Sequence, residues 1–129
     1  MGAVVAVWSE GHVLIIRDSY REQWSLPGSG IQAGEDPVAA IIREAKEEVG
    51  ITLSSDTLRY LGESDWVFEH VLHRDNVFES MLPSRPAVDI DNREVIRAEW
   101  HTKKSALEMD LTPQLRQYLK DLQHPMKAC

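Results

Sequence analysis

Three glutamates, Glu44, Glu47 and Glu48, stand close together in the stretch REAKEEVG, residues 43–50. Spaced three and four residues apart, they share one side of a helix if this stretch is helical. Carboxylates grouped in this way repel one another in water, and their hard oxygen atoms are the ligands that Mg²⁺ or Mn²⁺ prefers. The alternative is an acidic edge that faces only solvent. The cluster is therefore a candidate site for a divalent cation.

The neighbouring sequence favours the metal interpretation. A glycine-rich stretch, LPGSGIQAGED, precedes the cluster at residues 26–36. Its backbone could approach a ligand closely, because glycine has no side chain. Glu35 adds another carboxylate nearby, and Arg43 can reach Glu47 four residues further on. The cluster is thus set in a segment suited to close contacts.

The element that must position these glutamates is a helix predicted at residues 37–49. Asp36 suits the position that caps the helix, and Pro37 suits the first helical position. Gly50 is a natural stop. At about 100° per residue, one face of this helix is apolar and should pack on the core; its residues are Val38, Ile41, Ile42, Ala45 and Val49.

The remaining sequence predicts a sheet with a second helix. Strands are expected at 3–8 and 13–17, joined by the turn SEGH, and a final helix at 111–123 with Thr112 as its cap. Further extended segments are expected at 51–71, at 76–83 and at the end of 93–102, with a turn at 72–76 and a short helical turn at 103–107. The order β-β-α-β-β-α predicts an α/β protein with a mixed sheet and helices on both faces.

Composition sets the class of protein and some of its partners. The chain of 129 residues suits a single domain, residues 1–129, with 43% hydrophobic and 27% charged residues. A net charge of −7 argues against a stable nucleic-acid complex or binding to an anionic membrane. Cys129 is the only cysteine, so a reducing compartment is expected and Cys129 is no candidate nucleophile. No signal peptide or membrane span is visible, and the cytoplasm is the expected location.

The segment SGIQAGEDPVAAIIREAKEEVGI, residues 29–51, resembles the signature of the Nudix hydrolases, GX5EX7REUXEEXGU, where U is a bulky aliphatic residue. The residues that match in type and spacing are Glu35, Arg43, Glu44, Glu47, Glu48, Gly50 and Ile51. The preceding WSLPG, residues 24–28, is also similar to the family. Two positions depart: Ser29 replaces the first glycine, and Ala45 replaces a larger aliphatic residue. If position 29 needs a positive φ, serine would strain the loop.

The resemblance implies an α/β/α sandwich and the hydrolysis of a nucleoside diphosphate linked to another group. It implies that Glu44, Glu47 and Glu48 hold Mg²⁺ or Mn²⁺, helped by a main-chain carbonyl at Gly28 or Ser29. The general base is left open among Glu47, Glu48 and Glu94, the last of which lies in a segment, REVIRAEW, that is similar to the family's active-site loop. Glu99 is the weaker choice there. Arg43 is expected to orient a glutamate.

The linked group is the part of the expected substrate that the sequence specifies least. Subfamily markers, a proline or a tyrosine about fifteen to eighteen residues after the signature, are absent; the sequence there is WVFE, residues 66–69. A nucleoside triphosphate, including an oxidised or non-standard one, is therefore the favoured substrate. Trp66 or Phe68 could stack on a base, although strand aromatics usually pack in a core. Tyr20 and Arg21 could reach the substrate, or could belong to a solvated loop.

Two other functions fit the same sequence less well. One is a Nudix-fold module that binds a nucleotide with little or no turnover; only Ser29 favours it. The other is isomerisation of isopentenyl diphosphate, which needs a cysteine in the site, whereas this chain has one at Cys129. A homodimer is compatible with the family.

Overall fold

The computed structural model describes residues 1–122; Cys129 and the last residue of the helix expected at 111–123 lie outside these residues. The strands are β1 (Gly2–Ser9), β2 (His12–Asp18), β3 (Trp24–Ser25), β4 (Gly28–Gly30), β5 (Leu58–Phe68), β6 (Val71–Leu82) and β7 (Val95–His101). The helices are α1 (Pro37–Val49), α2 (Lys103–Leu107), α3 (Pro113–Asp121) and a single 3₁₀ turn at Ser55–Thr57. No helix within residues 1–122 is both long and apolar enough to cross a membrane.

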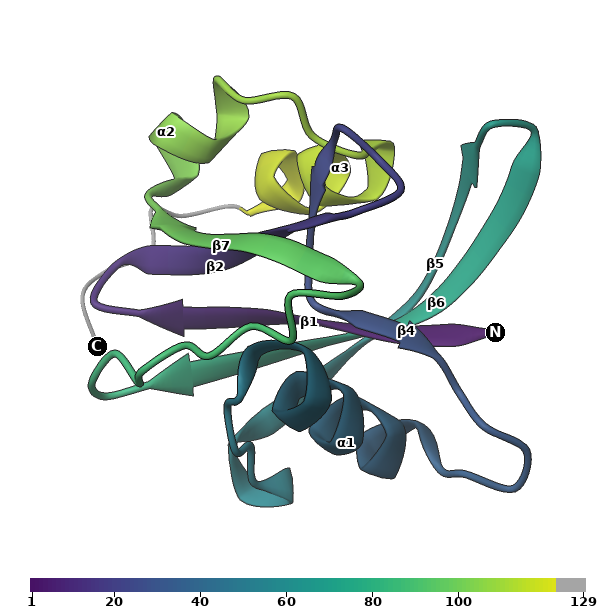
Figure 1. The fold of residues 1–129 in the computed structure, drawn as a ribbon, viewed down its shortest axis with the longest axis horizontal. Helices are drawn as coiled ribbons and strands as arrows, with labels where there is room; N and C mark the ends of the chain where they lie inside the picture. Colours follow the sequence, from purple (N-terminus) through teal and green to yellow (C-terminus); the bar gives the residue numbers. More distant parts are fainter. Residues whose placement is uncertain (123–129) are drawn as a thin grey trace.

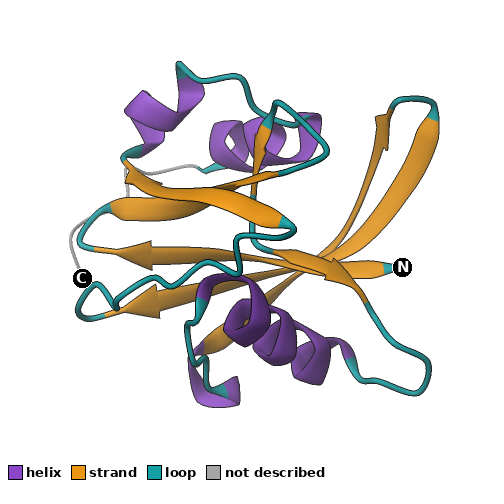
Figure 2. Ribbon diagram, in the orientation of Figure 1, coloured by secondary structure: helices purple, strands orange, loops and turns teal. Residues whose placement is uncertain are grey.

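The seven strands form one mixed sheet (Figure 2), as the sequence predicts. The order of the main strands is β3-β2-β1-β6-β5, with β4 paired to β1 and β7 paired to β2. The β1–β6 pair is parallel, and every other pair is antiparallel. β1 therefore lies at the centre of the sheet, next to strands that precede and follow α1.

Helices cover both faces of the sheet, with α1 on one side and α2 and α3 on the other (Figure 1). Alternate residues of β1 point to the two sides, and all eight of its residues are buried. Ala3, Val5 and Val7 pack with the core of α1, whereas the core beneath α3 contains Val4, Ala6 and Trp8. This arrangement is the expected α/β/α sandwich.

Helix α1 has the predicted bounds and the predicted apolar face. Ile41, Ala45 and Val49 are fully buried, and Gly50 ends the helix in the left-handed conformation with φ of 72°. Asp36 occupies the capping position, as predicted, although its side chain makes no capping hydrogen bond.

The turn predicted at residues 72–76 was also wrong. β5 and β6 form one long hairpin whose turn is at Glu69 and His70, both with positive φ (51° and 67°). The polar sequence RDN resembles a turn, but these residues belong to β6. Arg74 pairs across the hairpin with Asp65, at 2.9 Å between Nε and Oδ1, and the two residues after it are buried. The hairpin projects from the body of the sheet (Figure 1).

Candidate metal site and substrate cavity

Glu44 and Glu48 lie on the sheet-facing side of α1 and are almost completely buried, with 7% and 3% of their surface exposed. The Gly28 N–H donates a hydrogen bond of 2.9 Å to Glu48 Oε1, and the two carboxyl groups are also hydrogen-bonded to each other. Burial, partly offset by the hydrogen bond from Gly28 and assisted by the nearby charge of Glu44, raises the pKa of Glu48 to about 8. Burial likewise raises the pKa of Glu44. The two buried carboxyl groups are therefore more stable when they share a proton than when both are negatively charged.

Asp18 adds a third buried carboxylate that the sequence reasoning missed. It ends β2, where the register with β7 shifts between Arg17 and Asp18, and it is 7% exposed. Burial raises the pKa of Asp18, while the positive charge of Arg21 lowers it in part. The charge of Asp18 acts in turn on Glu48. An aspartate two residues after the apolar run VLII, where the strand gives way to a loop, was the available signal, because functional side chains gather on loops beside a rigid scaffold.

Glu47 does not join this buried group. Arg43 Nη1 donates to Glu47 Oε2 at 3.1 Å, and the Glu47 side chain is 58% exposed. Arg43 also forms a two-pronged contact with Glu35, at 2.8 Å from Nε to Oε2 and 2.9 Å from Nη2 to Oε1. These hydrogen bonds lower the pKa of Glu35 to about 2. Arg43 thus links Glu35 and Glu47, as an orienting role requires.

The departure from the family signature at Ser29 causes no backbone strain. Ser29 is exposed in β4 and has a negative φ, so its conformation suits any residue. The glycine that the fold needs is Gly28, with φ of 132°, where an added Cβ would lie 2.1 Å from the carbonyl oxygen of Ala3. The condition for strain at position 29, a positive φ, is therefore not met, because the close approach to β1 occurs one residue earlier.

Glu94 lies on the loop before β7, close to the buried carboxyl groups. Its carbonyl oxygen accepts a 2.7 Å hydrogen bond from the Ser19 N–H, which ties this loop to the end of β2. The charge of the exposed Glu94 side chain raises the pKa of both Glu44 and Asp18. Glu99 instead accepts a hydrogen bond from Arg97 and contacts a neighbouring histidine, and its lesser suitability as the acid stays a prediction.

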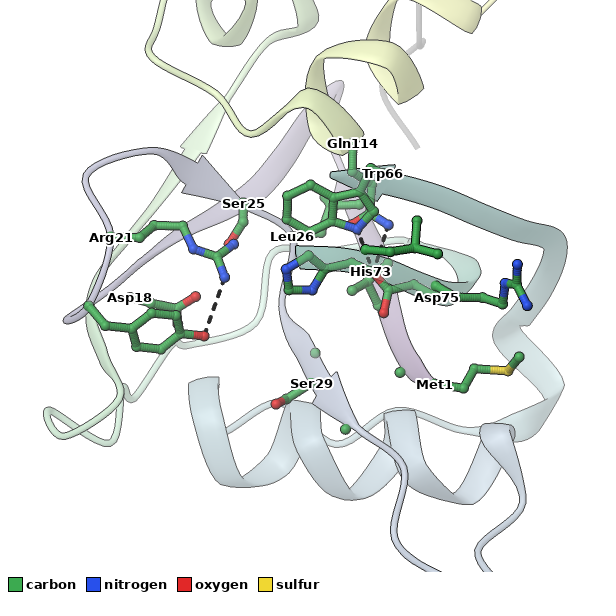
Figure 3. Close-up of a pocket in the computed structure, with 17 residues that line it drawn as sticks. Met1, Asp18, Arg21, Ser25, Leu26, Ser29, Trp66, His73, Asp75 and Gln114 are labelled. Carbon is green, nitrogen blue, oxygen red and sulfur yellow. Dashed lines mark hydrogen bonds between the residues drawn. The ribbon is translucent and has the colours of Figure 1, made fainter. Parts of the chain in front are cut away.

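A polar cavity of about 290 Å³ begins beside these acids. Gly28 and Asp18 line it together with Tyr20, Arg21 and Trp66 (Figure 3). The Arg21 guanidinium lies 5.1 to 5.7 Å from the ring centroids of three aromatic residues, Tyr20, Trp66 and Phe68. The structure therefore brings together the four residues that were proposed to contact substrate.

Two further residues of the cavity were not foreseen. Asp75, on β6, accepts hydrogen bonds from the Trp66 indole N–H and from the Gln114 amide, both of 2.9 Å and both to Oδ2. The face of Trp66 also stacks on His73, with ring centroids 4.4 Å apart. Asp75 and Gln114 are 39 residues apart and belong to different layers, and no local pattern in the sequence links them.

The acidic residues suit a divalent cation by their chemistry. Glu44 and Glu48 offer hard oxygen atoms, and a cation would replace the proton that they share. Within residues 1–122, no three acidic, histidine or cysteine side chains already converge as a complete ligand set. A third ligand requires Glu47 to leave Arg43, or Asp18 to approach from β2.

The comparisons with known proteins agree with the fold and the signature. A family model described as a NUDIX domain matches residues 1–122, and the chain therefore belongs to the Nudix family. An RNA pyrophosphohydrolase from Hydrogenovibrio crunogenus is 35% identical over 65 residues, a match that covers 50% of this chain and 38% of that protein. The matched segment thus spans well under half of that relative.

Solved structures resemble the chain over nearly its whole length. The E. coli dihydroneopterin triphosphate pyrophosphohydrolase superposes with a TM-score of 0.78 at 18% identity, covering 94% of this chain and 92% of the other. The MutT protein from Methanosarcina mazei Go1 gives a TM-score of 0.79 at 22% identity, covering 92% and 88%. At these identities the likeness establishes the fold.

Proposed function

We propose that the chain is a Mg²⁺- or Mn²⁺-dependent pyrophosphohydrolase that cleaves a pyrophosphate bond of a nucleotide. One observation carries this proposal: the carboxyl pair of Glu44 and Glu48 is buried and adjoins a polar cavity through Gly28, and its one ion pair within residues 1–122 is the 3.5 Å contact from Arg43 Nη2 to Glu44 Oε1. A fold selected only for stability gains nothing from such a pair, because buried carboxylates cost free energy unless they are neutralised. A bound cation supplies the missing charge.

Glu44 and Glu48 would hold the cation, with Glu47 joining them after it leaves Arg43 and with a main-chain carbonyl at Gly28 or Ser29 as a further ligand. When bound, the cation stabilises the negative charge that develops on the phosphoryl oxygens and favours ionisation of the attacking water. The Gly28 N–H fixes one oxygen of Glu48, which leaves its other oxygen for binding.

Glu94 is the best general base among the three candidates. Its side chain is exposed and, within residues 1–122, takes part in no recorded hydrogen bond or ion pair, whereas Glu47 and Glu48 are both engaged. A free carboxylate near Glu44 and Asp18 can accept a proton from water on the substrate side. Arg21, held among aromatic rings at the cavity, would bind a phosphate oxygen.

A nucleoside triphosphate is the proposed substrate class, oxidised or non-standard triphosphates included. The triphosphate pyrophosphohydrolase among the structural neighbours supports this choice. The alternative, a nucleotide-binding module with little turnover, loses its one argument because Ser29 is unstrained. The cytoplasm, a possible homodimer and the lack of a stable nucleic-acid complex stay as predictions from the sequence.

The test is phosphate and pyrophosphate release from a panel of nucleotides with and without Mg²⁺. The panel contains common and oxidised triphosphates, ADP-ribose, diadenosine polyphosphates and 5′-triphosphorylated RNA. Magnesium-dependent turnover of triphosphates is expected. Nucleotide binding without turnover of any compound would contradict the proposal and favour the binding module.

A further inference from the structure

Asp75 is a buried carboxylate that faces the cavity away from the metal site. It is 9% exposed, and both of its donors, Trp66 and Gln114, hydrogen-bond to the same oxygen, Oδ2. Figure 3 shows Asp75, Trp66 and Gln114 on one side of the cavity and Asp18 with Arg21 on the other. A ligand whose phosphates reach the acidic side can therefore extend toward Asp75.

The second oxygen of Asp75, Oδ1, lies next to the backbone of Gly2. Within residues 1–122, Oδ1 takes part in no recorded hydrogen bond. It lies directly over Gly2, where an added Cβ would be only 2.4 Å away. The glycine leaves room for Oδ1, so the carboxylate keeps an unused acceptor at the cavity.

The hydrogen-bond partners also fix what Gln114 presents. A carboxylate can only accept, and an indole N–H can only donate, so Gln114 must direct its NH₂ group toward Asp75. The amide oxygen of Gln114 then points away from Asp75, and Gln114 is itself a lining residue of the cavity. At this end of the cavity, Asp75 Oδ1 is an acceptor without a partner among the described residues, and the Gln114 amide keeps its oxygen and its second N–H.

We propose that Asp75, positioned by Trp66 and Gln114, determines base specificity by selecting a guanine-type edge. Guanine presents a ring N–H beside an amino group, which gives two adjacent donors for the two lone pairs of the unengaged Oδ1. Xanthine, uracil and thymine present a carbonyl in place of the amino group and would face oxygen against oxygen. This inference rests on the proposed function, which supplies the nucleotide.

The decisive comparison is between GTP and XTP, which differ in the replacement of the 2-amino group by a carbonyl. Wild-type kcat/KM is expected to favour GTP by about 10- to 100-fold, the usual discrimination of a paired base contact. In Asp75→Asn the remaining oxygen must still accept from Trp66 and Gln114, so the new NH₂ group faces the cavity. The GTP/XTP ratio should then fall at least about tenfold or invert.

A matched control removes the same charge elsewhere: Asp56→Asn, at an exposed position beside β5, should keep the wild-type ratio. If Asp75→Asn fails to fold, Gln114→Leu removes one donor to Asp75 and should also lower the ratio. A merely structural defect would lower the rates for GTP and XTP together and leave their ratio unchanged.

A wild-type protein that hydrolyses XTP as well as GTP overturns the inference, and so does an unchanged ratio in Asp75→Asn. Either result leaves the proposed hydrolase function standing. If no nucleotide is hydrolysed at all, the proposed function fails instead, and calorimetric binding of GTP and XTP tests Asp75 separately. Equal affinities for the two nucleotides would then overturn the role of Asp75.

Discussion

Glu48 and Asp75 are two buried carboxyl groups beside one cavity, and the protein treats them in opposite ways. Asp75 receives two hydrogen bonds from neutral side chains, which stabilise its charge. Glu48 receives one from the Gly28 backbone and faces a second carboxyl group, and its pKa rises to about 8. Asp75, whose charge is stabilised by hydrogen bonds within the protein, can recognise a polar ligand. Glu48, whose charge is stabilised less, is suited to bind a cation.

Removing the charge of Glu48 should have the largest effect on function. Glu48→Gln keeps the shape of the side chain but weakens cation binding. kcat/KM should therefore fall at least about 100-fold, which is more than the loss caused by mutating a residue that only supports a metal ligand. Without metal, the same variant should be at least as stable as the wild type, because it no longer buries an ionisable pair. Steady-state kinetics and thermal melts check both. Wild-type activity in this variant would refute the assignment.

Substitution of Gly28, whose N–H holds Glu48, should have the next largest effect. In Gly28→Ala, the new Cβ would clash with the β1 backbone at a φ that L-residues rarely adopt. The free energy of unfolding should fall by about 2–6 kcal/mol, the sum of backbone strain and overpacking. Denaturant unfolding measures this loss, and a fully stable variant would show that β4 shifts freely.

Glu48 should also make the stability of the folded protein depend on pH. Because the folded-state pKa of Glu48 is raised above its usual 4.5, the folded protein holds a proton that the unfolded chain has released. Without divalent cations, the free energy of unfolding should therefore decrease as the pH rises from about 4.5 to about 8, by at most about 1.4 kcal/mol per pH unit. Denaturant titrations with a chelator test this slope.

Two additions sharpen that measurement. Glu48→Gln should flatten the slope, and saturating Mg²⁺ should reverse part of the loss at pH 8 by binding the ionised carboxylates. A slope that is the same in the wild type and in Glu48→Gln would assign the effect to other groups.

Restoring the family's usual residue should have the smallest effect. Ser29→Gly is expected to change the free energy of unfolding by no more than about 0.5 kcal/mol, as for other exposed positions, and to leave kcat unchanged. The reason is that Ser29 is exposed and its φ is already negative. A large gain in activity would show that serine does hinder the metal site.

The sequence predicted the features that depend on local patterns. The apolar face of α1, its end at Gly50 and the helices on both sides of the sheet all followed from residue spacing. The position of the β5–β6 turn could not be predicted in this way. Glu69 and His70 are not residues that usually form turns, whereas the polar segment RDN resembles a turn.

The site was predictable only where its residues are close in sequence. Glu44 and Glu48 could be placed together from their spacing, but the contact of Glu48 with Gly28 depends on the pairing of β4 with β1. Glu47 lies apart from this pair because it forms an ion pair with Arg43. Residue spacing alone does not show which glutamate Arg43 will contact. Asp75 and Gln114 meet only because α3 packs against the sheet.

The most direct test is to measure Mn²⁺ binding by calorimetry or electron paramagnetic resonance in three proteins without nucleotide. Wild type and Asp75→Asn should bind the cation with similar affinity, because Asp75 is satisfied by Trp66 and Gln114. Glu48→Gln should bind it at least about tenfold more weakly, as expected for a damaged metal site. Equal binding by Glu48→Gln and the wild type would contradict the account, because the buried pair would then not be the metal site.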